Sequence, residues 1–363
     1  MKELINSIRI FLIYRFYNLG VIFERISNKG FALDIFSSSF QNNPYKTYSR
    51  MRSINPIYHS KPTFLRWVTK MDLVQEMIRD ERFSVDDRKF PIAKLRRNEL
   101  RRDGRDIMLD QFENPSILKL DPPDHSRIRK LVSYGFTNRY IKSLETEIND
   151  TINQCLDKTH NLESFDLMNV LAKPLPAIVI AKMMGLPDSD LNQFQIWSEN
   201  LLKEVGGIGS SVKKRKLARD AYEDLIRYFE KIIIERKNNP GDDFIGKLIL
   251  AEEEGDKLNV KEMYGTCLLL LIAGHETTTR LVGNGLFALL NHPDQFEYLK
   301  DDHSKIPNAI EEMLRYEPPV HATVRFANEN MTYRNRDYKR GTPFAISIAG
   351  ANRDPEANQD PDS

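Results

Sequence analysis

Along most of this chain, apolar residues recur at every third or fourth position, a period that predicts amphipathic helices. The clearest helical stretches cover residues 140–160, 165–184, 211–237 and 306–316. Short alternations of aromatic and β-branched residues predict strands instead, and these cover residues 55–69, 322–327 and 342–348. We therefore expect a mainly α protein with a minor β part that includes short hairpins.

The longest helical pattern begins after Asn259 and continues to Asn291. Asn259 and Glu262 have the spacing of a capping box, and His292-Pro293 stops the helix. A helix of this length extends about 48 Å at 1.5 Å per residue, which is enough to traverse a whole domain. The pattern therefore predicts a long central helix that crosses the protein.

Polar residues interrupt this helix near its middle, within the stretch LLLLIAGHETTT at residues 268–279. An apolar run ends there in Ala273-Gly274, followed by His275, Glu276 and Thr277. Burying an ionisable carboxylate or an unpaired hydroxyl costs several kcal/mol unless the group is paired or used. The stretch is therefore a candidate functional site. A core helix whose polar residues face a water-filled crevice explains it equally well.

Two further pairs of residues have a spacing that places both side chains on one face of a helix. His125 and Arg129 follow a helix start at Leu120-Asp121-Pro122-Pro123, and a spacing of four places both on one face. Two cationic donors on one face suit an anionic ligand, although a surface pair without a function is the alternative. Glu312 and Arg315 are three apart and predict an ion pair, which on a surface is usually worth under about 1 kcal/mol.

The charges and cysteines exclude several classes of protein. The 53 Lys and Arg nearly cancel the 52 Asp and Glu, so no overall field favours nucleic acid. Residues 86–106 are strongly basic but contain interleaved acids and few aromatics, which predicts an irregular solvated loop. Cys155 and Cys267 are far apart, which argues against a disulfide framework or a zinc knuckle. We expect a reducing, cytoplasmic location.

The N-terminal residues 4–23 are rich in aliphatic and aromatic side chains. Arg9, Arg15 and Asn18 interrupt this stretch, so it falls short of the ~18 uninterrupted apolar residues of a spanning helix. We expect an amphipathic helix that packs on the body of the protein. Contact with a membrane is not expected, and peripheral binding to a membrane surface is the alternative.

Four motifs follow one another along the chain. They are LDPPDHSRIRKLVSYGF, NNPGDDFIGKLI leading into AGHETT, Glu312-Met313-Leu314-Arg315 with RYEPPV after it, and AISIAGANRDPE at residues 345–356. In this order they resemble the cytochrome P-450 haem-thiolate monooxygenases in their soluble bacterial form. Each motif is weak by itself, but the ordered set is specific. The resemblance implies a helical extension over residues 1–40 and a cytochrome P-450 domain over residues 41–363.

The resemblance assigns roles around a haem b cofactor. His125, Arg129 and Arg325 would bind the haem propionates through charge-assisted hydrogen bonds. Glu312 and Arg315, which match the family's ExxR motif, would hold the proximal side of the haem in place. These five roles are expectations drawn from the family.

The resemblance also assigns the polar cluster of the long helix to dioxygen chemistry. Glu276 and Thr277 would deliver the protons needed to split dioxygen, and Ala273 and Gly274 would leave room for it. The implied substrate is an apolar small molecule, and a ferredoxin or flavodoxin would supply electrons. Leu202, Val205 and Ile208 fit an apolar pocket, although core packing explains them equally well.

The resemblance is incomplete at the iron ligand. The family's ligand is a cysteine thiolate in a glycine-rich loop, and this sequence contains no such loop. Cys267 precedes Thr277 by ten residues, or about 15 Å of helix, and Cys155 falls in a different helix. We therefore expect a C-terminally truncated member that lacks the ligand loop, the helix after it and the last strands.

Two hypotheses follow for the activity. The parent protein would be a monooxygenase, whereas this polypeptide alone would be inactive, as a fragment or as a pseudoenzyme that keeps the scaffold. A haem peroxygenase that uses hydrogen peroxide is a third possibility. The presence of Glu276-Thr277 argues against it, because a peroxygenase needs no relay for two protons.

Overall fold

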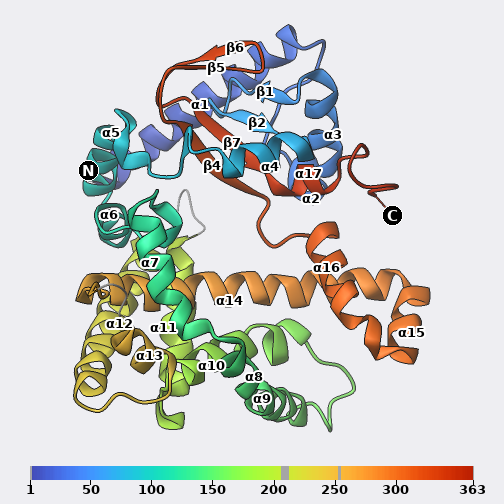
Figure 1. Ribbon diagram of the computed structural model, residues 1–363. Coiled ribbons are helices and arrows are strands. Elements are labelled where there is room, and N and C mark those ends of the chain that lie inside the picture. Colours follow the sequence, from blue (N-terminus) through green and yellow to red (C-terminus); the bar gives the residue numbers. More distant parts are fainter. Residues whose placement is uncertain (1, 206–211, 252–254, 363) are drawn as a thin grey trace. The chain divides into compact units, whose positions relative to one another are not determined.

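The computed structural model describes residues 2–205, 212–251 and 255–362. The chain forms two compact units. The first unit contains the residues up to Pro91 together with those from Pro293 onward, and the second contains Ile92–His292. Helices predominate in both units, and the strands lie in the first (Figure 1). The predicted fold class, mainly α with a minor β part, is confirmed.

The first unit is built on a five-stranded sheet. Its spatial order is β1 (Ile57–His59), β2 (Arg66–Val68), β7 (Pro343–Ser347), β4 (Ala322–Ala327) and β3 (Phe83–Ser84). β1 and β2 form the predicted hairpin, with Ile57 opposite Val68. β2 pairs with β7 in parallel, and the other pairs are antiparallel. A second hairpin joins β5 (Met331–Tyr333) to β6 (Arg336–Tyr338).

The described part of the first unit also contains seven α-helices. They are α1 (Lys2–Ser27), α2 (Ser38–Asn42), α3 (Tyr45–Ile54), α4 (Met71–Arg79), α15 (Pro293–Asp301), α16 (Ile306–Tyr316) and α17 (Ile348–Asn352). In α4, the apolar positions Leu73, Val74 and Met77 recur at helical spacing and pack into one core with Phe344 and Ile346 of β7. Burial of these side chains holds α4 on the sheet, since each contributes about 1.5–3 kcal/mol.

The second unit is helical in its described residues. Its α-helices are α5 (Ile92–Arg102), α6 (Asp106–Glu113), α7 (Asp124–Ser133), α8 (Asn138–Ser143), α9 (Glu145–Asp157), α10 (Pro174–Met183), α11 (Leu191–Val205), α12 (Val212–Asn238), α13 (Phe244–Leu250) and α14 (Val260–Asn291). α10, α11 and α12 pack against α14, and the core between them contains the fully buried Phe194, Leu225, Phe229 and Leu271. α14 therefore runs through the middle of this unit (Figure 1).

The predicted bounds of α14 are confirmed. The Asn259 side chain accepts a hydrogen bond from the Glu262 amide at 3.0 Å, and the Glu262 side chain accepts one from the Asn259 amide at 2.8 Å. The helix ends at Asn291, before His292 and Pro293. Two local signals, a capping box and a proline stop, therefore bound a helix of 32 residues.

The prediction of an irregular loop over residues 86–106 is wrong, because α5 forms within it. Ala93 and Leu100 of α5 are buried in a small core with Phe112 of α6. Arg97 and Arg101 are ion-paired with Glu113 at 3.3 and 3.1 Å. The sequence pattern does not predict this helix, because only a few of its positions are apolar.

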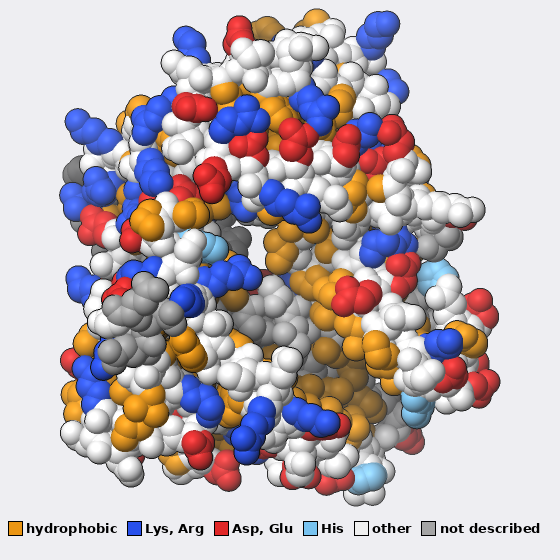
Figure 2. All heavy atoms as spheres, in the orientation of Figure 1, with side chains coloured by type: hydrophobic (Ala, Val, Ile, Leu, Met, Phe, Trp, Pro, Cys, Tyr) orange, Lys and Arg blue, Asp and Glu red, His pale blue; other side chains and the backbone are white. Residues whose placement is uncertain are grey.

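Cationic and acidic side chains are interspersed over the visible surface, as the balanced composition predicts (Figure 2).

The predicted packing of the N-terminal helix is confirmed for the described side chains of α1. Tyr17 and Val21 are buried, and Glu24 is fully buried one turn further on. In the described part of the chain, no helix combines the length and the apolar character that a membrane crossing requires.

Candidate functional site

The AGHETT residues lie on α14, but the structure divides them between two faces. His275 is the buried ionisable group, with 3% of its surface exposed, and Thr279 one turn later is also buried. The Glu276 side chain is 36% exposed and pairs with Arg280 at 2.6 Å. The expectation that Glu276 is a buried acid is therefore wrong. A turn of 100° per residue places it beside, and not on, the face occupied by His275.

Thr277 makes a hydrogen bond to the backbone of its own helix. Its hydroxyl Oγ1 donates to the carbonyl of Ala273 at 2.5 Å. Such bonds to the residue four positions earlier are typical of hydroxyls within helices and bend them slightly. The donated proton is therefore engaged, while the lone pairs of Oγ1 can accept a hydrogen bond from water or a ligand.

Gly274 allows α14 and α10 to approach closely. A Cβ atom at this position would lie 2.9 Å from Cδ1 of Ile180, which is closer than side chains normally pack. The lack of a side chain at Gly274 therefore allows α14 and α10 to pack closely. The predicted role of Ala273 and Gly274 in making room for dioxygen stays a prediction.

His275 is a residue of the site whose role sequence reasoning missed. Its Nδ1 lies 2.5 Å from the hydroxyl of Ser198 on α11, and its ring is also hydrogen-bonded to the backbone of Lys173, just before α10. Burial lowers the pKa of His275, which favours the neutral imidazole. A neutral ring has one donor and one acceptor, so both are used here. The spacing of four from the buried Leu271 is the sequence signal for this burial.

His125 and Arg129 lie on one face of α7, as predicted. His125 is half-buried and Arg129 is exposed. Within the described part of the chain, neither side chain is engaged in a hydrogen bond or an ion pair. Both donors are therefore available to an external ligand, and an anion matches their charge.

Arg127, which the sequence analysis did not single out, orients α7 relative to α14. It projects from the opposite face of α7 and pairs with Asp256 at 3.1 Å and with Glu262, the capping residue of α14. The hydrogen bond to Glu262 raises the pKa of the Arg127 guanidinium. Within the second unit, this pairing fixes the helix that carries His125 and Arg129 to the start of the helix that carries Glu276 and Thr277.

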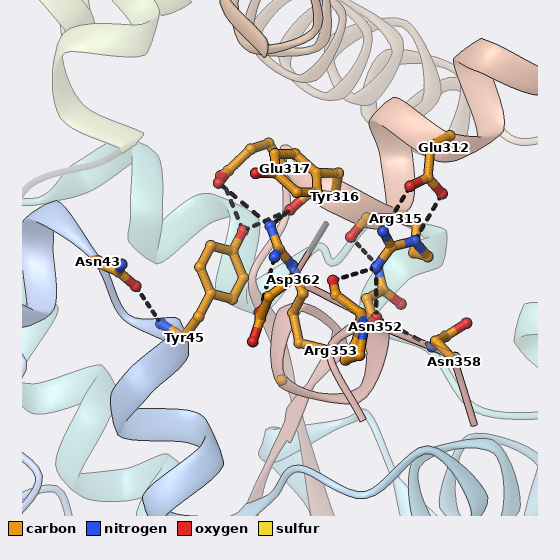
Figure 3. Close-up of polar contacts among 12 residues, drawn as sticks. Asn43, Tyr45, Glu312, Arg315, Tyr316, Glu317, Asn352, Arg353, Asn358 and Asp362 are labelled. Carbon is orange, nitrogen blue, oxygen red and sulfur yellow. Dashed lines mark hydrogen bonds and ion pairs between the residues drawn. The ribbon is translucent and has the colours of Figure 1, made fainter. Parts of the chain in front are cut away.

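The predicted Glu312–Arg315 ion pair is present in the first unit (Figure 3). Arg315 donates to both carboxylate oxygens of Glu312, at 2.7 and 2.6 Å. It also donates to the carbonyls of Asn352 at 3.2 Å and Pro361 at 2.8 Å. Arg315 therefore does more than form a salt bridge, because its two bonds to backbone carbonyls tie α16 to the end of α17 and the segment that follows it.

Arg353 is the second arginine of this network, and sequence reasoning missed it. Its guanidinium lies 4.2 Å from the ring centre of Tyr45 and 4.0 Å from that of Tyr316. It donates to the Tyr316 carbonyl at 2.7 Å and to Asp362 at 3.0 Å (Figure 3). Two aromatic faces around a buried cation make a favourable cation–π arrangement.

Arg325 lies on β4 of the first unit. Its guanidinium donates to the Val324 carbonyl at 3.2 Å and to the Thr323 hydroxyl at 3.3 Å. Its predicted action together with His125 and Arg129 stays a prediction. Of the residues predicted to form an apolar pocket, Ile208 lies outside the described residues.

The two cysteines are buried thiols in the second unit. Cys267 on α14 is fully buried, and burial raises its pKa to about 12. Burial also raises the pKa of Cys155 on α9. In the ranges that the structure describes, no group of three or more His, Cys, Asp or Glu residues is arranged to hold a metal ion. A thiol that stays protonated is a poor metal ligand, because thiolates are the form that binds.

Comparison with known proteins agrees with these motifs. The sequence profile of the family described as Cytochrome P450 matches residues 90–363. The polyketide biosynthesis cytochrome P450 PksS of Bacillus subtilis is 36% identical over 330 residues, which cover 89% of this chain and 79% of that protein. The solved structure of PksS matches with a TM-score of 0.79 at 34% identity, over 91% of this chain and 81% of that one. CYP109E1 from Bacillus megaterium in complex with testosterone matches with a TM-score of 0.76 at 33% identity, over 88% and 80%.

Proposed function

Because this chain belongs to the cytochrome P450 family, we propose that it is built to oxidise an apolar small molecule with dioxygen. Members of the family are haem-dependent monooxygenases, and haem b, when bound, supplies the iron chemistry that activates dioxygen. The similarity to a polyketide biosynthesis enzyme and to a structure with testosterone supports a largely apolar substrate. We further propose that a ferredoxin or flavodoxin supplies the electrons, as the family resemblance implies.

The two cationic donors on α7 are the observation that best supports haem binding. His125 and Arg129 share one face and lack partners among the described residues, while haem presents two carboxylates in its propionates. Charge-assisted hydrogen bonds to such carboxylates are about twice as strong as neutral ones. The donor set therefore fits the anionic edge of the cofactor, and we propose Arg325 as a third donor.

Glu276 and Thr277 are proposed to handle protons. Both hydrogen bonds from Arg280 reach Oε1 of Glu276, at 3.1 and 2.6 Å, which leaves Oε2 for water. A partly exposed carboxylate can exchange protons with solvent, and the Thr277 hydroxyl one residue later can accept a proton and donate its own once it leaves the Ala273 carbonyl. Glu276 thus faces the source of protons, and Thr277 marks the position from which they are delivered.

Hemin titration of the purified 363-residue chain tests the proposal. Arg129→Ala weakens hemin binding by about tenfold or more, because a hydrogen bond to a charged group is worth about 1.5–3 kcal/mol. His125→Ala is expected to weaken hemin binding for the same reason. Binding is followed by absorbance at fixed ionic strength. Arg139→Ala, which removes an exposed arginine from α8, is the control and leaves the affinity unchanged. An equal loss of hemin affinity in all three variants would show that hemin is attracted by general positive charge, and it would overturn the assignment of His125 and Arg129 as propionate donors.

The cysteines support a second proposal, that these 363 residues alone are catalytically inactive. Cys155 and Cys267 are both buried thiols with raised pKa, and neither provides the thiolate that the family's chemistry needs.

The reduced, carbonyl-bound form of the hemin-loaded chain therefore lacks a thiolate-type Soret band. The measurement is a reduced difference spectrum. A thiolate-type band that disappears in Cys155→Ser or Cys267→Ser contradicts this proposal, while leaving the assignment of the propionate donors untouched.

A further inference from the structure

Helix α1 is attached to the first unit by one face only. Tyr17, Val21 and Glu24 are buried there. The Glu24 carboxylate accepts hydrogen bonds from the amides of Leu33 at 3.0 Å and Lys61 at 2.6 Å, and from the Tyr58 hydroxyl. These bonds satisfy the buried charge and hold the helix in a defined rotation about its own axis.

The opposite face of α1 is apolar and exposed. Between 44% and 74% of the surface is accessible at each of five large side chains, namely Phe16, Leu19, Ile22, Phe23 and Ile26. At 100° per residue, the centre of this arc lies about 170° from the centre of the buried one. A contiguous apolar stripe on a surface is typical of an interaction site, because it gains free energy when covered. We define this stripe as the outer face of α1.

The charges around the outer face are positive. Arg15 falls within its arc, Arg25 lies about 60° beyond it, and Lys29 follows the helix. Glu24 is the only acid in residues 16–27, and it is buried on the other side. An apolar stripe with flanking cations is the arrangement of helices that lie in the interface of an anionic membrane.

We propose that the outer face of α1 docks on an anionic lipid surface, with the helix lying parallel to the membrane plane. The apolar side chains would enter the boundary between headgroups and acyl chains, and the arginines would meet the lipid phosphates. A second copy of the chain is a poorer occupant, because it would bring the same cations together. The sequence favoured packing on the body over a membrane contact. The structure shows that packing uses one face and leaves the other exposed.

Vesicle flotation of the full chain tests this proposal. We expect binding to vesicles of phosphatidylcholine with one third phosphatidylglycerol, weaker binding to pure phosphatidylcholine, and loss of the difference at high salt. Phe16→Ser with Phe23→Ser lowers the partition coefficient at least tenfold, because two buried phenylalanines are removed. Phe287→Ser is the matched control, since this phenylalanine on α14 is 71% exposed and lies outside α1. Thermal melting confirms that each variant is folded.

Three results would overturn the proposal. The first is equal partition of the wild-type chain and the double variant, and the second is no binding to either vesicle. The third is a dimer that forms without lipid and that Phe16→Ser with Phe23→Ser abolishes, measured by analytical ultracentrifugation. In that case the outer face is a contact between two copies.

Discussion

Asp243→Ala lowers the free energy of unfolding of the second unit by about 4 kcal/mol. Oδ1 of Asp243 accepts the Gly246 amide at 2.8 Å and caps α13, and loss of such a cap costs about 1 kcal/mol. Oδ2 pairs with Arg236 at 2.6 Å, and both side chains are largely buried. Removing Asp243 leaves the largely buried Arg236 with only the exposed Glu235, at 3.1 Å, as an acidic partner, at a cost of about 3 kcal/mol. Urea denaturation followed by circular dichroism measures the change.

The neighbouring Asp242 is a matched control for this substitution. Its side chain is exposed, so Asp242→Ala changes stability by less than about 0.5 kcal/mol. Asp243→Asn falls between the two, because the amide oxygen can still cap α13 but cannot neutralise Arg236. If Asp243→Ala and Asp242→Ala unfold at the same urea concentration, the buried pair does not hold this part of the unit together.

Arg353→Ala has the second largest expected effect, about 3 kcal/mol on the stability of the first unit. The Arg353 side chain is 6% exposed, and its guanidinium lies between the rings of Tyr45 and Tyr316. Its loss removes two desolvated cation–π contacts of about 1–2 kcal/mol each and leaves the Tyr316 carbonyl without its charged donor. Thermal and urea denaturation of the full chain measure the effect.

Glu312→Ala provides the comparison within the same network. The Glu312 side chain is 50% exposed, so its loss costs under about 1 kcal/mol even though its pairing with Arg315 is bidentate. A larger cost for Glu312→Ala than for Arg353→Ala would mean that the exposed pair, and not the buried arginine, stabilises the segment after α17.

Several elements could be predicted from the sequence because their signals are local. The capping box at Asn259 and the stop at Pro293 bound α14, and the predicted bounds of α16 and β4 match the structure. In each case, residues within a few positions of one another determine where the backbone begins and ends its hydrogen-bonding pattern. The ion pair between Glu312 and Arg315 was predictable for the same reason, since one turn of helix brings them together.

The errors arose where a partner lies far away in the sequence. Residues 92–102 form a helix because Leu100 packs against Phe112 of the next helix, which the local pattern does not reveal. His275 is buried because α10 and α11 cover its face of α14, and its partner Ser198 is 77 residues away. Glu276 is an exception, because its partner Arg280 lies only four residues away and its carboxylate remains partly exposed.

By itself, the sequence determined the fold class, the position of the long helix and the residue types available for haem and dioxygen chemistry. Only the tertiary structure decided which of those residues are buried, which are paired and which remain available. Among the described residues, His125 and Arg129 have no partner, whereas Arg127 on the opposite face of α7 pairs with Asp256 and Glu262. α1 has two apolar faces in the sequence, and only packing against Leu33 and Tyr58 shows which one stays exposed. Periodicity is a property of one segment, whereas burial depends on the segments that cover it.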